Sequence, residues 1–145
     1  MCKSAANPTP EPTVILPSSS GRISNADLMI VLRLVAPDAQ IFLSDKSYLL
    51  CSEEDVARFL AQDKTNKLEY EPDALDCDDF SYHLLGQFSV PGWSDLAFGI
   101  VWTDKHALNC MVMEDGTFWL VEPQADTLQS GLLAWQGSKY RLIVM

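Results

Sequence analysis

The spacing of apolar residues changes at Pro91-Gly92, and this change limits the architectures open to the chain. Before that point, apolar residues recur at helical spacing, for example at Leu28, Leu32 and Val35. After it, short runs of strand-forming residues alternate with turn signals such as Glu114-Asp115-Gly116. Helices followed by an antiparallel meander of strands predict an α+β fold, with the helices packed on a C-terminal antiparallel sheet.

Three helices are predicted, at about 25–35, 53–63 and 77–85. Ser24 or Asn25 can cap the first, and Ser52 can cap the second, with Asp55 in the place that a capping box gives to Glu. We expect Gly86 to end the third helix. Extended segments are predicted at 40–43, 47–51, 96–103, 106–113, 117–122, 133–135 and 139–144.

Residues 1–20 contain four of the eight prolines, so 1–21 is predicted to be a flexible tail and 22–145 a single domain. The 145 residues are 48% hydrophobic, which is enough for one real core. The formal net charge of −10 disfavours nucleic acid as a partner and favours divalent cations or basic partners. The alternative is that the acidic surface only keeps the protein soluble. Long apolar runs and a secretory leader are missing, so we expect no membrane contact and a cytoplasmic location.

Four cysteines without a CxxC pair support neither a zinc ribbon nor a disulfide framework. Cys77 is distinctive because it stands at the start of the third helix, among Asp76, Asp78 and Asp79. The exposed N–H groups of a helix N-terminus favour a thiolate, whereas three neighbouring carboxylates oppose it. The local sequence therefore leaves two interpretations open: a nucleophile, or a small buried apolar side chain.

The chain has two histidines as candidate bases. His83 follows Cys77 by six residues (83 − 77), about 240° around a helix, and so points away from it. His106 follows a tight turn at the start of a predicted strand, from which its ring can reach a helix N-terminus. Glu122 ends the next strand and can lie beside His106 to orient the imidazole. An ordinary turn histidine and strand-end glutamate are the alternatives.

Acidic residues around Cys77 also allow a metal site. Asp76, Asp78, Asp79 and Glu122 are hard oxygen ligands of the kind that calcium prefers. Acidic residues at a helix start can equally serve only to complement the helix dipole. A zinc site from Cys77, His106 and Cys110 matches no common spacing.

Three blocks of this chain carry a family resemblance: Asp76-Cys77-Asp78-Asp79-Phe80, His106-Ala107-Leu108-Asn109 and Val121-Glu122-Pro123-Gln124. They lie in the same order, and His106 follows Cys77 by 29 residues (106 − 77). Over residues 40–128 the chain resembles the papain-like cysteine protease domain at the C-terminus of the Marasmius oreades agglutinin and related stand-alone bacterial and phage proteins. We expect no sugar-binding β-trefoil, like the one that precedes that domain, within these 145 residues.

The resemblance implies a cysteine peptidase that acts on a protein or peptide, or a related acyl transferase. It implies Cys77 as nucleophile, His106 as general base and acid, and Glu122 as the orienting acid. It also implies calcium dependence, with Asp78 and Asp79 as ion ligands. The alternative is a catalytically silent papain-like domain that acts as a calcium-binding or protein-interaction module. The oxyanion-hole donor is open, with the backbone N–H of Cys77 as one candidate.

Overall fold

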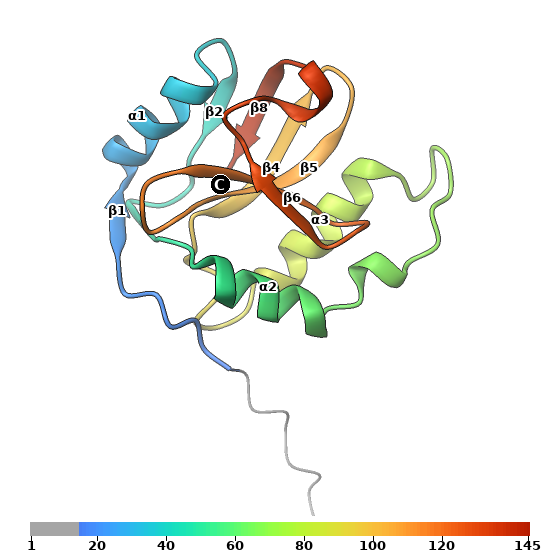
Figure 1. Ribbon diagram of the computed structural model, residues 1–145, viewed down its shortest axis with the longest axis horizontal. Helices are drawn as coiled ribbons and strands as arrows, with labels where there is room; N and C mark the ends of the chain where they lie inside the picture. Colours follow the sequence, from blue (N-terminus) through green and yellow to red (C-terminus); the bar gives the residue numbers. More distant parts are fainter. Residues whose placement is uncertain (1–14) are drawn as a thin grey trace, which may run out of the picture.

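The computed structural model describes residues 15–145 and contains three α-helices, a two-stranded sheet and a six-stranded sheet (Figure 1). The helices are α1 (Asn25–Val35), α2 (Glu53–Gln62) and α3 (Cys77–Phe88). The small sheet pairs β1 (Arg22–Ser24) with β3 (Ser47–Leu49). The large sheet has the order β2 (Gln40–Phe42), β8 (Tyr140–Val144), β4 (Phe98–Thr103), β5 (Ala107–Val112), β6 (Phe118–Glu122), β7 (Thr127–Ser130).

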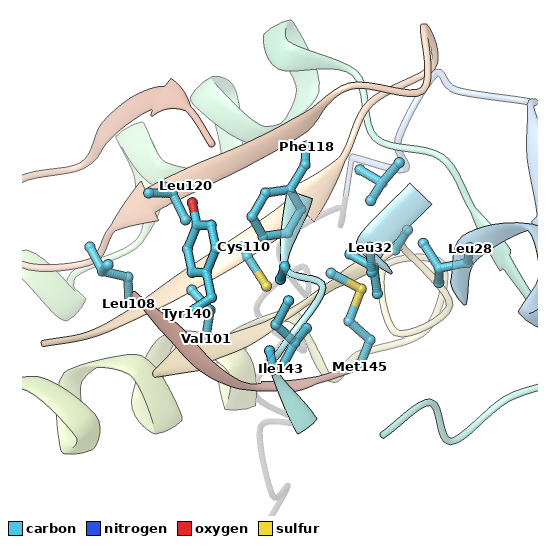
Figure 2. Close-up of a cluster of buried hydrophobic side chains, with 14 of the residues drawn as sticks. Leu28, Leu32, Val101, Leu108, Cys110, Phe118, Leu120, Tyr140, Ile143 and Met145 are labelled. Atoms are coloured by element: carbon cyan, nitrogen blue, oxygen red, sulfur yellow. The ribbon is translucent and has the colours of Figure 1, made fainter. Parts of the chain in front are cut away.

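The large sheet separates two hydrophobic clusters, because successive side chains of a strand point to opposite faces. On one face, Leu28 and Leu32 of α1 belong to the same buried cluster as Leu108 and Cys110 of β5, as Figure 2 shows. On the other face, α2 and α3 pack over Met111 of β5. Figure 1 shows the same layering, with α1 on one side of the central strands and α2 and α3 on the other. The predicted α+β class is confirmed.

Helix α3 runs past the glycine that was expected to end it. The prediction that Gly86 is the C-terminal stop is wrong, because the helix continues to Phe88. The ring of Phe88 is 2% exposed and stacks on that of Phe98 at a centroid distance of 4.0 Å. Burying a phenylalanine contributes about 1.5–3 kcal/mol, whereas a glycine within a helix costs about 1 kcal/mol. Tertiary packing therefore outweighs the local stop signal.

The strands depart from the predictions in four places, the first of which is β1, a strand that was not predicted. Residues 133–135 form no strand but lead into a short 3-10 helix, η2 (Trp135–Gly137). Strand β7 was not predicted. Most of its residues are exposed, so its sequence lacks a strong alternation of apolar and polar residues. Strands β2 and β3 follow each other in the chain but do not pair with each other. Strand β2 instead runs parallel to β8, the one parallel pair among the named strands of the six-stranded sheet.

The predicted serine caps are present, but the carboxylate of Asp55 has other partners than a capping box would give it. Ser24 accepts a hydrogen bond from the Asp27 N–H, and Ser52 accepts one from the Asp55 N–H. The carboxylate of Asp55, however, accepts hydrogen bonds from the N–H and the hydroxyl of Ser18, at 2.7 and 2.9 Å. The last residues of the predicted tail, 15–21, thus contact the domain, whereas 1–14 lie outside the described residues. Within 15–145 no helix is long and apolar enough to cross a membrane.

Candidate active site

His106 and Glu122 meet at the end of the large sheet. His106 directly precedes β5 and Glu122 ends β6, and these two strands are antiparallel neighbours. The Nε2 atom of His106 lies 2.7 Å from Oε2 of Glu122, with side-chain exposures of 17% and 9%. A carboxylate can only accept, so Nε2 carries the proton. In the neutral imidazole this leaves Nδ1 with a lone pair that can accept a proton.

Both partners of this pair are held by their backbone surroundings. Thr103 ends β4, and its hydroxyl oxygen accepts the N–H groups of Lys105 and His106 at 3.1 and 3.0 Å. The second carboxylate oxygen of Glu122 accepts the N–H of Gln124 at 3.1 Å. The orientation of the ring and of the carboxylate is therefore fixed before any ligand binds.

Cys77 is the first residue of α3, and its N-cap is Asp76. The direction of α3 follows from two aromatic contacts along its length. The ring of Tyr82 lies 5.7 Å from that of Trp102, which pairs with Ala107 at the start of β5. The ring of Phe88 stacks on Phe98. Since Phe98 pairs with Met111 near the end of β5, α3 runs parallel to β5. The start of α3, with Cys77, therefore lies toward the end of the sheet that carries His106.

A buried amide fastens α3 to β5. Asn109 of β5 donates from Nδ2 to the carbonyl oxygens of Ser81 and Gly99, at 3.0 and 3.2 Å. Ser81 in turn donates its hydroxyl to the carbonyl oxygen of Cys77 at 2.9 Å. Asn109 and Ser81 are both 0% exposed. These bonds connect the strand that follows His106 with the first turn of the helix that begins at Cys77. No hydrogen bond joins the Cys77 thiol to His106 in residues 15–145.

Cys77 differs from the other described cysteines in its environment. Cys51 and Cys110 are 0% exposed, whereas Cys77 is half-buried, and all three are free thiols. Burial raises the pKa of Cys51 and of Cys110 far above that of an ordinary thiol. At neutral pH those two are therefore protonated and inert, which leaves Cys77 as the accessible thiol of residues 15–145.

The acidic residues around Cys77 can cap α3 and can hold a cation. One ligand atom each from Asp76, Cys77 and Asp78 lie within 4.8 Å of one another. The pKa of Asp78 is raised, first by a hydrogen bond with Asp76 and then by partial desolvation. Asp76 and Asp79 form a capping box, in which the Asp79 carboxylate accepts the Asp76 N–H at 3.1 Å and the Asp76 carboxylate accepts the Asp79 N–H. Two hard carboxylates fit a cation such as calcium, and Asp76 is better placed than Asp79 to share it with Asp78.

Sequence reasoning missed the aromatic neighbour of the imidazole. The Trp135 ring lies 5.3 Å from the His106 ring. Trp93, by contrast, is 3% exposed and belongs to the core. Trp135 lies in an irregular segment whose position depends on tertiary contacts, so no local pattern marks it.

The second histidine has a structural contact. His83 Nδ1 lies 2.8 Å from the Thr65 hydroxyl, which belongs to the 3-10 helix η1 (Thr65–Lys67). The interpretation of His83 as a packing or surface residue agrees with this contact. A cavity of about 890 Å³ borders Thr103 and Asp104 but none of Cys77, His106 and Glu122.

The helices and the mostly antiparallel sheet form a papain-like fold, which confirms the resemblance noted from the sequence at the level of the fold. The structure of a PSL1a–E64 complex matches with a TM-score of 0.74 and 21% sequence identity over 86% of this chain. A Polyporus squamosus lectin bound to the human-type influenza-binding epitope Neu5Aca2-6Galb1-4GlcNAc matches with a TM-score of 0.71 and 20% identity, also over 86%. This chain spans 51% and 49% of those chains, about half their length. No family model and no curated protein matches the chain.

Proposed function

We propose that this protein is a cysteine peptidase in which Cys77 attacks a peptide bond, His106 transfers the proton and Glu122 orients His106. The observation that carries the proposal is the 2.7 Å contact between His106 Nε2 and Glu122 Oε2. This contact leaves Nδ1 as the basic nitrogen, at the end of the sheet toward which α3 brings Cys77. A half-buried thiol at a helix start and an imidazole with a carboxylate partner have the arrangement of a thiol catalyst.

Each step of the reaction uses a group of this chain. The thiol proton of Cys77 passes to Nδ1 of His106, and the sulfur attacks the substrate carbonyl carbon. The carbon–nitrogen bond then breaks, and the leaving amine takes the proton from His106. A water molecule, deprotonated by His106, hydrolyses the thioester and returns free Cys77. The charge of Glu122 stabilises the imidazolium between these steps, and unbonded N–H groups at the start of α3 can bind the oxyanion.

A peptide substrate is supported by the structural comparison. PSL1a is complexed with E64, a peptide-like inhibitor, and its fold matches 86% of this chain. Asp76 and Asp78 further support a calcium requirement. Bound there, calcium would supply positive charge that offsets the two carboxylates beside the thiolate. Asp79 was predicted as the second ligand, and we propose Asp76 in that place because its carboxylate oxygen lies within 4.8 Å of that of Asp78.

Two measurements on the same samples test this function. The first is cleavage of casein by the parent protein, with calcium and with a chelator, and the second is covalent labelling by E64 read by mass spectrometry. We expect calcium-dependent cleavage and one E64 adduct, on Cys77, and the loss of both in Cys77→Ala. Cys110→Ala, which removes a buried thiol, serves as the matched control and keeps both activities.

The possible outcomes separate the two candidate functions. Cleavage that survives Cys77→Ala would overturn the proposed triad. Calcium binding without either cleavage or E64 labelling would favour the catalytically silent module. Cleavage that persists in the chelator would remove calcium from the proposal and leave the triad in place.

A further inference from the structure

The cavity of about 890 Å³ lies where α1 and β4 end and where β2 and β8 begin. Its wall consists of the last residue of α1 and the loop that follows, Gln40 of β2, residues 102–104, Ala134 and residues 138–142. Pockets that hold small ligands in proteins measure about 300–1,000 Å³, so this volume is sufficient for one. A ligand in this cavity would occupy a site separate from the proposed triad, because no triad residue lines it.

Part of the wall is apolar and aromatic. Trp102 of β4 and Leu142 of β8 are cross-strand neighbours, and both line the cavity. Val35 of α1 and Ala134 add smaller apolar side chains. The flat ring of a tryptophan favours offset or edge contacts with other flat apolar groups. The cavity therefore suits a ligand with a flat apolar body.

A β-bulge brings Arg141 to the same wall. Trp102 pairs with Leu142 and Thr103 pairs with Tyr140, so β8 has one residue more than β4 between these two pairs, and this residue is Arg141. Bulges of this kind re-aim a side chain and are common beside binding sites. Lys139 also lines the cavity. Two of the ten basic residues of a chain with a net charge of −10 thus share one wall.

These two cations are free, whereas other polar groups of the wall already have partners. The Thr103 hydroxyl oxygen accepts the His106 N–H at 3.0 Å. The Asp104 carboxylate accepts the backbone N–H of Lys139 at 2.8 Å. By contrast, the side chains of Lys139 and Arg141 form no ion pair with any residue of 15–145. They remain open to a ligand.

The unpaired charges of the wall favour an anion, because two cations outnumber the one carboxylate without an ion pair in the described chain, that of Asp38. The planar guanidinium of an arginine binds a carboxylate through two parallel hydrogen bonds. We propose that this cavity binds an organic anion with a flat apolar body. Its carboxylate lies on Arg141 and Lys139, and its body packs against Trp102. The proposal does not depend on the peptidase function.

Isothermal titration calorimetry with two probes of matched shape tests the site. Naphthalene-2-carboxylate has the flat body and the charge, whereas naphthalene-2-carboxamide has the same body without the charge. Arg141→Gln removes the cation but keeps a hydrogen-bond donor. Lys46→Gln removes the same charge from an exposed lysine outside the cavity and is the matched control. Asp38→Asn removes the carboxylate that repels the probe.

We expect the carboxylate to bind once per chain and the carboxamide to bind roughly tenfold more weakly. Arg141→Gln should weaken carboxylate binding roughly tenfold, and Lys46→Gln should match the parent. Asp38→Asn should strengthen it about two- to fivefold, as expected for one exposed charge.

Three results would overturn the site: a folded parent without saturable carboxylate binding, equal affinity for the two probes, or equal losses in Arg141→Gln and Lys46→Gln. Failure of Asp38→Asn to strengthen binding would also contradict the described wall. Cleavage and E64 labelling are not used as readouts, so the site can fail while the proposed peptidase function holds, and the reverse.

Discussion

Asn109→Asp is the substitution that most directly tests how α3 is held on β5. The amide of Asn109 is 0% exposed and donates to two backbone carbonyl oxygens, of Ser81 and Gly99. Aspartate has nearly the same shape but, when ionised, has no proton to donate. The change therefore keeps the packing volume and replaces the donor of both contacts by an acceptor.

The magnitude of the effect follows from the two contacts. Losing two hydrogen bonds costs about 1 kcal/mol each, and a buried charge without a partner raises the total to about 3–5 kcal/mol at pH 7. For a chain of this size, 1 kcal/mol corresponds to about 2–4 °C in melting temperature. We therefore expect Asn109→Asp to melt about 10 °C below the parent at pH 7. Such a loss is a large part of the 5–15 kcal/mol that stabilises a typical domain.

The pH dependence of the loss has a definite sign. Burial and the two facing carbonyl oxygens raise the pKa of the new carboxyl above its unfolded value of about 3.9. The charged form, and its penalty, are thus present above the raised pKa and disappear as the pH falls through it. The difference in melting temperature between variant and parent should be smaller at pH 5 than at pH 7.5.

Thermal melts followed by circular dichroism at both pH values provide the measurement. Asn25→Asp is the matched control, because Asn25 also donates its amide to a carbonyl oxygen, that of Asp45, but at an exposed site. It should melt within about 2 °C of the parent, as expected for a surface substitution. A melting temperature of Asn109→Asp within 2 °C of the parent at pH 7.5, or a difference that widens on acidification, would refute the described contact between α3 and β5.

Two further predictions concern the reactive groups. Glu122→Gln keeps an acceptor beside His106 but removes its charge, so peptidase kcat/KM should fall about 10–100-fold, since a charged hydrogen bond contributes about 1.5–3 kcal/mol. An unchanged kcat/KM would show that the carboxylate has no part in the reaction. A low dose of iodoacetamide at pH 7.5 should alkylate Cys77 before Cys51 and Cys110, because burial shields these two and raises their pKa. Peptide mapping reads each position separately, and equal labelling of the three would contradict their described burial.

Much of the fold could be predicted because its signals are local. Ser24 and Ser52 cap their helices as expected, since a cap depends on the few residues that follow it. The turn before His106 and the hairpin before β6 likewise have their own turn residues. Gly86 misled the prediction because the contact that overrides it, between Phe88 and Phe98, joins residues on different elements. Similarly, β7 depends on its pairing with β6 rather than on its own composition.

The candidate site likewise contains some residues that local sequence patterns mark and others that only tertiary contacts identify. Cys77, His106 and Glu122 could be proposed because each stands at the boundary of an element that the sequence marks. The pairing of His106 with Glu122 is present in the structure, although it was inferred only from neighbouring strands. Trp135 and Asn109 could not be assigned roles, because one lies in an irregular segment and the other is defined by contacts to two separate elements. Tertiary contacts alone identify residues of this kind.

The parallel course of α3 and β5 explains why this fold suits a thiol and an imidazole. Both Cys77 and His106 stand where an element begins, so two elements that run side by side in the same direction bring their first residues to the same end. Asn109 then fixes how far α3 slides along β5, because it bonds to Ser81, one helical turn beyond Cys77. A change in this bond would move Cys77 relative to His106 without touching either, and in the proposed peptidase a shift of about 1 Å can cost about 100-fold in rate. Variants at Asn109 that still fold should therefore lose cleavage more than they lose E64 labelling, because cleavage needs both groups in position at every step.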